Sequence, residues 1–184
     1  MSRITLLASL PFLVLGQDPP LSLESFQSSC ALLSAEEQRE VDLIIQGRYR
    51  DAGTDFGQAW RDLDLQIRNQ VMLLRARMWN VSPAPVGAMS SLYSVLARNM
   101  VNDAFELDSP LEREWALDKG RWVLIQDLTR PEDPFGLDRV LSYGLRLQLV
   151  HRWAGIDSDR GRDTFDSLVR ACMDEAQLGL KVEG

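Results

Sequence analysis

The sequence contains 184 residues, of which 45% are apolar and 26% are charged, a composition typical of a globular protein and unlike that of disordered, collagenous or membrane chains. A chain of this length can form one domain whose core needs no metal ion or disulfide for support. The formal net charge of −7 argues against nucleic acid as a partner, because affinity for phosphates comes largely from Lys and Arg. Nearly all of the 20 basic residues are Arg, which pairs well with carboxylates, so we expect acidic protein surfaces as partners.

The first element in the chain is a mostly apolar stretch at residues 4–15. Arg3 before it, and Val14 with Gly16 at its end, give the order of charge, apolar core and small residues that is typical of a secretion signal. However, Pro11 interrupts the stretch, and about 12 residues are too few to span ~30 Å of hydrocarbon as a helix. Composition therefore leaves two interpretations open, a signal peptide and a segment buried in the fold.

Two N-terminal helices are predicted from their capping residues. Ser22 precedes apolar residues at steps of three and four, which predicts a short helix beginning there. Ser34 and Glu37 have the spacing of a capping box, and the helix that follows is predicted to end at Gly47. The apolar residues of these two helices are Leu23, Phe26, Cys30, Leu33, Val41, Ile44 and Ile45. Residues 48–57 are predicted to form a loop.

The clearest helical period lies between residues 56 and 80, where apolar residues fall in one narrow stripe. The stripe consists of Trp60, Leu63, Ile67, Val71, Leu74 and Met78. It is either an ordinary core face, which its short length favours, or a seam for a partner helix. Residues 81–87 must end the helix because they contain two prolines and a glycine, so Trp79 beside them is expected to be exposed.

Two further helices are predicted over residues 88–105 and 109–129. The apolar residues of the first are Leu92, Val95, Leu96 and Met100. SPLE at 109–112 is a helix start with a cap, a proline at the first position and a capping box. The second helix carries apolar residues on two faces, which predicts that it is covered on two sides, and Gly120 permits a neighbour to approach closely.

Residues 137–153 are predicted to form the central helix of the domain, because apolar residues cover most of its circumference. Arg139, Tyr143 and Arg146 project together from the remaining arc at i, i+4 and i+7.

A last helix is predicted over residues 159–178, followed by a frayed tail at 179–184. The sequence has no sustained apolar alternation of the kind that predicts strands. The predicted fold is therefore all-α, a compact domain of about six to seven helices over residues 4–178.

Motifs for catalysis are missing from the sequence. His151 is the only histidine, and it lies in the central helix with no GxSxG or Cys–His companion, so we expect a hydrogen-bonded boundary residue rather than a general base. A hydrolase or small-molecule site around His151 is the least favoured interpretation. The sequence also lacks the glycine-rich loops that hold nucleotide phosphates. We predict no enzyme activity, no catalytic residue and no cofactor.

Metal sites are not predicted either. Acidic residues occur in i, i+2 pairs, whose side chains diverge on a helix, and the calcium-like stretch at 157–163 lacks the later bidentate Glu. Cys30 and Cys172 lie among apolar residues with no zinc-type spacing. Reduced core thiols are favoured over a disulfide, a preference that secretion of the chain would reverse.

Four segments, LLASLP, DPPLSLESF, LDKGRWVLIQDLTR and DPFGLDRVLSYGLRLQLVHRW, carry a resemblance to a known family. They are similar to an uncharacterised bacterial family whose genes lie among those for V-type (A-type-like) ATP synthase subunits. These operons lack an obvious gene for the subunit that joins the central stalk to the membrane ring. The resemblance covers most of residues 4–170 and is most specific at 115–153. Family members begin close to LLASLP, which implies that the opening stretch belongs to the core of the fold.

The resemblance implies a non-catalytic subunit or an accessory or coupling factor of a rotary ATPase, standing in for the joining protein that these operons lack. The implied partners are central-stalk or membrane-ring subunits. The implied location is cytoplasmic, with only indirect membrane contact, whereas a signal peptide at residues 1–16 would mean secretion. A free-standing helical adaptor or regulator, which would recruit a helix through the Trp60–Met78 stripe, is the alternative.

Geometry alone suggests which residues meet a partner. They are Arg139, Tyr143, Arg146 and Arg152, with Arg121 as an outlying member. Arg152 fits least well because it falls on the apolar arc of its helix. The alternative is that these arginines form ordinary surface salt bridges, each of small energetic value.

Overall fold

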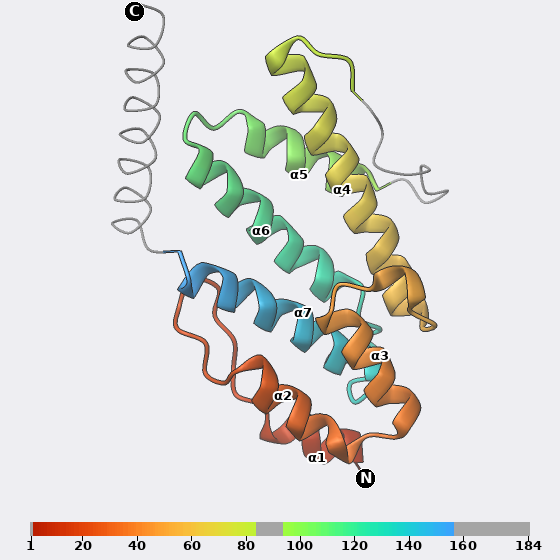
Figure 1. Cartoon of the computed structure of the whole chain (residues 1–184). Coiled ribbons are helices and arrows are strands. Elements are labelled where there is room, and N and C mark those ends of the chain that lie inside the picture. Colours follow the sequence, from red (N-terminus) through yellow and green to blue (C-terminus); the bar gives the residue numbers. More distant parts are fainter. Residues whose placement is uncertain (1, 84–93, 157–184) are drawn as a thin grey trace, which may run out of the picture.

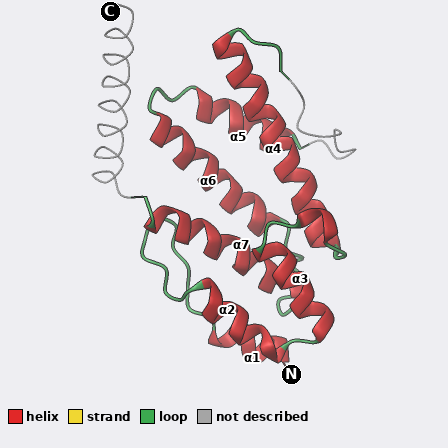
Figure 2. Cartoon of the chain, in the orientation of Figure 1, coloured by secondary structure: helices red, strands yellow, loops and turns green. Residues whose placement is uncertain are grey.

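The computed structural model describes residues 2–83 and 94–156, and these residues form only helices, turns and loops (Figures 1 and 2). The α-helices are α1 (Ser2–Ser9), α2 (Leu23–Ser29), α3 (Ala35–Ile45), α4 (Asp55–Trp79), α5 (Val95–Phe105), α6 (Pro110–Asp127) and α7 (Leu137–Ala154). Short 3-10 turns occur at Cys30–Leu32 and Tyr49–Asp51. The predicted all-α class is confirmed.

Several predicted features lie outside the described residues. They are the last helix over 159–178, the tail at 179–184, the calcium-like stretch at 157–163 and Cys172. The C-terminal boundary of the predicted domain lies there as well.

Helix α7 is central, as predicted. It lies between α6 on one side and α2 and α3 on the other (Figure 1), and it also contacts α1 and α4. Its buried residues include Val140, Leu141, Leu145, Leu147 and Val150, which point in several directions around the helix. Helix α7 is therefore buried on most of its circumference.

The core has two clusters of buried side chains. The larger one surrounds α7 and includes Phe26, Ile44 and Trp60, whereas the smaller one lies between α4, α5 and α6 around Ile67. Leu63 packs against both clusters. Trp60 and Ile67 are almost fully buried, so the first part of the predicted Trp60–Met78 stripe is a core face. Met78 and Trp79 are 59% and 71% exposed, and the exposure predicted for Trp79 is confirmed.

The opening segment packs onto α7 in two parts, the helix α1 and an extended stretch after it. Leu6 and Leu13 are buried in the larger core cluster. The Tyr143 hydroxyl donates a hydrogen bond to the Pro11 carbonyl at 2.9 Å. The burial predicted for this segment is wrong for Phe12, which is 86% exposed. Helix α1 was not predicted, because Pro11 ends the helical pattern after only two turns.

The predicted N-caps are confirmed. The side chains of Ser22, Ser34 and Ser109 each accept a hydrogen bond from a backbone N–H three residues later. The Ser34–Glu37 box is reciprocal, whereas the box predicted at 109–112 has only the bond to the Ser109 side chain. Thr54 caps α4 in the same way.

Helix α5 begins at Val95 and buries a different face from the predicted one, while residues 88–93 of the predicted helix, with Leu92, lie outside the described residues. Ser94 caps it, and the Gln66 side chain on α4 donates to the Ser94 carbonyl and accepts from its N–H at 2.7 and 2.9 Å. Val95 and Leu96, two of the apolar residues that indicated this helix, are 56% and 54% exposed. The buried face consists instead of Ala97, Val101 and Ala104. Small residues occupy it because α5 is closely packed against both α4 and α6.

Helix α6 is covered on two sides, as predicted, by α5 and α7. Gly120 faces α5, and a Cβ at this position would overlap the Met100 thioether. The close approach predicted for Gly120 is therefore confirmed.

We expect Leu6→Ala to lower the free energy of unfolding by roughly 2–5 kcal/mol, because it opens a cavity in the larger core cluster. Ile4→Ala in the same helix is the matched control, since Ile4 is 51% exposed, and should change stability by less than about 1 kcal/mol. Urea unfolding followed by tryptophan fluorescence measures both. Equal, small losses would contradict the burial of Leu6.

Candidate functional site

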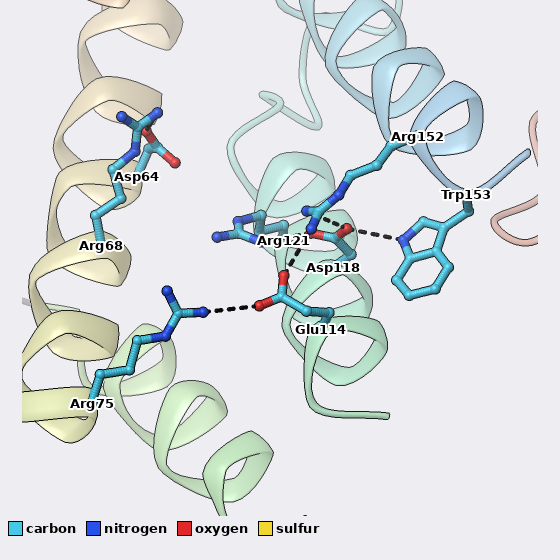
Figure 3. A network of polar contacts seen from close by, with 8 residues as sticks. All are labelled: Asp64, Arg68, Arg75, Glu114, Asp118, Arg121, Arg152 and Trp153. Atoms are coloured by element: carbon cyan, nitrogen blue, oxygen red, sulfur yellow. Dashed lines mark hydrogen bonds and ion pairs between the residues drawn. The ribbon is translucent and has the colours of Figure 1, made fainter. Parts of the chain in front are cut away.

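A fully buried carboxylate, that of Asp118 on α6, is the centre of the candidate site (Figure 3). Arg121 Nη1 lies 2.6 Å from Asp118 Oδ1, and Arg152 Nη1 from α7 donates to Oδ2 at 2.9 Å. The indole Nε1 of Trp153 donates to the same Oδ2 at 2.9 Å. A buried charge is tolerated only when it is paired and hydrogen-bonded, and these three donors meet that requirement.

Glu114, one turn before Asp118, extends the contacts to α4. Its carboxylate accepts from Arg152 Nη2 at 2.8 Å and from Arg75 Nη2 on α4 at 3.2 Å. Glu114, Asp118 and Arg121 have i, i+4 and i+7 spacing, so they share one face of α6. We call Arg75, Glu114, Asp118, Arg121, Arg152 and Trp153 the Asp118 network. It connects α4, α6 and α7 (Figure 3).

A groove of about 690 Å³ lies next to the Asp118 network. Helix α4 provides one wall with Arg68, Met72, Arg75 and Trp79, which have i, i+4, i+7 and i+11 spacing. The opposite wall consists of Glu114, Leu117 and Arg121 from α6 and Arg152 from α7. We call this the arginine groove.

The charge of the arginine groove is opposite to that of the whole chain. The described residues of its lining include four arginines and one carboxylate, that of Glu114, whereas the chain has a net charge of −7. Asp118 is buried behind the wall, and Asp64 is paired with Arg68 at 2.7 Å. Even with these two carboxylates included, the positive charges remain in excess.

The five residues predicted to meet a partner do not form one surface. Arg121 and Arg152 meet at Asp118 and line the arginine groove. Arg152, the member that fitted least well, connects α7 to α6, because its guanidinium donates to Asp118 and Glu114. Of the other three, Tyr143 bonds to Pro11 and Arg146 lies beside residues 12–15, whereas Arg139 lies one helical turn before Tyr143 on α7.

Tyr143 is only 7% exposed, so the prediction that it projects from a polar arc is wrong. Its ring packs against Phe26 at a centroid distance of 5.4 Å, and its hydroxyl bonds to Pro11. Burial raises the pKa of Tyr143 to about 12, although the positive charge of Arg146 opposes this. The physical reason for the error is that the N-terminal segment covers this part of α7.

Arg146 and Arg139 are half-buried rather than freely exposed. The Arg146 guanidinium lies over the Trp122 ring, 5.2 Å from its centroid, and Nε donates to the Ser142 carbonyl at 3.3 Å. Burial lowers the pKa of Arg146 from its usual value. The Nε of Arg139 is buried and has no hydrogen-bond partner among the described residues. Replacing either by Glu is therefore expected to disturb packing as well as charge.

His151 is half-buried and hydrogen-bonded, as predicted. Its Nε2 lies 2.9 Å from the Leu21 carbonyl oxygen, which can only accept, so Nε2 carries the proton and donates. This bond holds the segment before α2 against α7. Within the part of the chain that the structure describes, no group of three His, Cys, Asp or Glu side chains could hold a metal ion.

Cys30 has a free, buried thiol. Burial, and secondly the negative charge of Asp42, raises the pKa of this thiol to about 11. An unreactive core cysteine is the result.

Comparison with known proteins finds one family. Residues 94–176 match the sequence profile of DUF2764, described as a protein of unknown function. The matched region includes α5, α6 and α7, and so Glu114, Asp118, Arg121 and Arg152, but not the α4 wall of the groove. The match supports the similarity to an uncharacterised family and carries no indication of a rotary ATPase. No curated protein and no solved structure matched the chain.

None of the described helices has the length and apolarity needed to cross a membrane.

The sequence did not predict a site at Asp118, Glu114, Arg68 or Arg75. A signal was present, because Glu114, Asp118 and Arg121 form a charged row on the predicted helix over 109–129. Such rows are common on solvated helix faces, so the spacing alone could not show that Asp118 is buried.

We expect Asp118→Asn to lower the free energy of unfolding by about 2–3 kcal/mol, because it leaves two arginines without their shared counter-charge. The loss should be smaller than the ~3–5 kcal/mol typical of a fully buried pair, since the Arg152 side chain is 44% exposed. Asp127→Asn, an exposed change on the same helix, should cause no loss. Chemical denaturation measures both, and an equally stable Asp118→Asn chain would contradict the importance of the network.

We expect the ionisation of Tyr143 to lower the free energy of unfolding at alkaline pH. Because its folded-state pKa of about 12 lies above the ordinary value of 10, the folded state retains the proton longer, and stability falls as pH rises from 10 to 12. Tyr143→Phe removes this contribution and costs about 0.5–1.5 kcal/mol at neutral pH for the lost hydrogen bond. The stability difference between the two chains should therefore shrink above pH 10 in denaturation at stepped pH. A constant difference would contradict the buried hydroxyl.

Proposed function

We propose that the chain is a non-catalytic subunit or accessory coupling factor of a bacterial V-type ATP synthase, and that it acts by binding other proteins. The structural observation that supports partner binding is the arginine groove beside the exposed Trp79. The support for a V-type ATP synthase is the sequence resemblance described above.

The arginines of the α4 wall have capacity for a partner. The side chains of Arg68 and Arg75 are 57% and 49% exposed, and among the described residues each forms an ion pair with one carboxylate. A guanidinium has five N–H donors, so these described ion pairs use only part of the donor capacity of each arginine. Arg and Trp are also the residues most enriched among those that dominate binding energy at protein interfaces.

Ordinary surface salt bridges explain only part of this groove. They account for the contacts of Arg68 with Asp64 and of Arg75 with Glu114. They do not account for Trp79, whose indole is 71% exposed at the end of the same wall. Large aromatic side chains are usually mostly buried, so an exposed one next to a charged groove favours an interface.

Within a V-type ATP synthase, we propose contact with proteins of the central stalk or the membrane ring. The chain would then reach the membrane only through these proteins and lie on the cytoplasmic side. Arginines on the chain and carboxylates on a stalk helix would orient such a contact. A free-standing adaptor was predicted to bind through the Trp60–Met78 stripe, but Trp60 and Ile67 are buried. We therefore propose that an adaptor would also use the arginine groove, and the identity of the bound proteins distinguishes the two functions.

We expect V-type ATP synthase subunits to co-purify with the chain when it carries an affinity tag at its native locus. The measurement is mass spectrometry of the purified material against a strain that expresses the tag alone. Enrichment of stalk or ring proteins is the expected result. Recovery of other proteins, with the ATPase complex intact in the unbound fraction, would contradict the ATPase role and favour the adaptor.

A further inference from the structure

We infer that the arginine groove binds an amphipathic helix of a partner protein, with acidic residues along its flanks and apolar residues facing the groove. This inference rests on the proposed role in partner binding and specifies the chemistry of the partner.

The shape of the groove fits a helix. The α4 wall from Arg68 to Trp79 is a straight row spanning three helical turns, roughly 16 Å at 1.5 Å per residue. The opposite wall is another helix, α6, with the end of α7 beside it (Figure 3). An amphipathic helix placed in an elongated groove between helices is a recurrent mode of peptide recognition.

The charge of the groove selects an acidic partner. Arg68 and Arg75 lie on one wall and Arg121 and Arg152 on the other. A helix that lies along the groove, over the Arg75–Glu114 ion pair that joins the two walls, therefore meets guanidinium groups on both flanks. Carboxylates match these groups in geometry as well as in charge. Nucleic acid fits less well, because Glu114 lies within the groove and the chain is acidic overall.

The floor of the groove is apolar. It consists of the apolar side chains that the two walls contribute, which are Val71, Met72 and Ala76 from α4 and Leu117 from α6, and Trp79 lies at one end. These side chains can contact the apolar row of a partner helix, and the flexible Met72 thioether can adapt to its shape. An acidic helix without an apolar face would leave this floor exposed to water.

The test places a photo-crosslinking amino acid at position 72 or 79 of the full chain expressed from its native locus. Position 77 is the control, because Arg77 is exposed on α4 and turned about 200° from Arg75, away from the groove. The cross-linked peptide is then sequenced by mass spectrometry. We expect a segment of another protein with apolar residues at i, i+3 or i+4 and flanking Asp or Glu, found at 72 and 79 but not at 77.

Charge reversal tests the arginines directly. Arg75→Glu should reduce the yield of this cross-link at least tenfold, whereas Arg77→Glu should leave it unchanged. Replacing the nearest Glu of the partner segment by Arg should restore the yield with Arg75→Glu. Since Arg75→Glu also disturbs Glu114, the double variant Arg68→Gln/Arg75→Gln, which removes charge but keeps side-chain length, should give the same loss.

Four results would overturn the inference. They are cross-links from 72 and 79 only to this chain's own residues beyond 156, cross-links only to a second copy of the chain, a partner segment without acidic flanks, and no cross-link at all.

The proposed function is judged separately. If ATPase subunits still co-purify with the Arg75→Glu chain at the normal level, the ATPase role remains and the groove is not its interface. If the acidic helix belongs to an unrelated protein, the groove chemistry remains and the ATPase role is lost.

Discussion

The burial of α7 on nearly all sides is the constraint on which the rest of the structure depends. A helix with apolar residues around most of its circumference must be covered by several other elements, and here α6, α3, α2 and the N-terminal segment provide that cover. The polar groups on α7 must then find partners within the fold. Tyr143 bonds to Pro11, Gln148 donates to the Ile45 carbonyl at the end of α3, and His151 bonds to Leu21. These three bonds fix segments that lie far apart in the sequence against one helix.

The structural elements that depend on local sequence could be predicted. Ser22, Ser34 and Ser109 identify helix starts because a cap involves only the next three residues. The central position of α7 follows from its own apolar pattern. The buried face of α5 could not be found in this way, because Ala97 and Ala104 are small and a pattern of large apolar residues points to Val95 and Leu96 instead.

The candidate site was harder to predict because it depends on contacts between distant segments. The orientation of Tyr143 follows from residues 2–15 lying over α7, which the helix itself cannot reveal. In the sequence, Asp118 cannot be distinguished from an acidic residue on a solvated helix face. Its partners Arg152 and Trp153 follow it by more than 30 positions, and only the fold brings them into contact with it. The sequence did identify Arg121 and Arg152 as notable arginines, but it did not show that a buried carboxylate holds them together.

The division of roles among the arginines indicates how the groove can bind. Arg121 and Arg152 hold a fully buried carboxylate, so drawing either away would leave a buried charge poorly compensated. A partner therefore gains most from Arg68 and Arg75, whose existing pairs are more exposed and weaker. Contacts of this exposed kind are screened by salt and contribute little affinity individually. The apolar floor and Trp79 must then supply most of the binding energy, while the four arginines determine which helix fits and in which orientation.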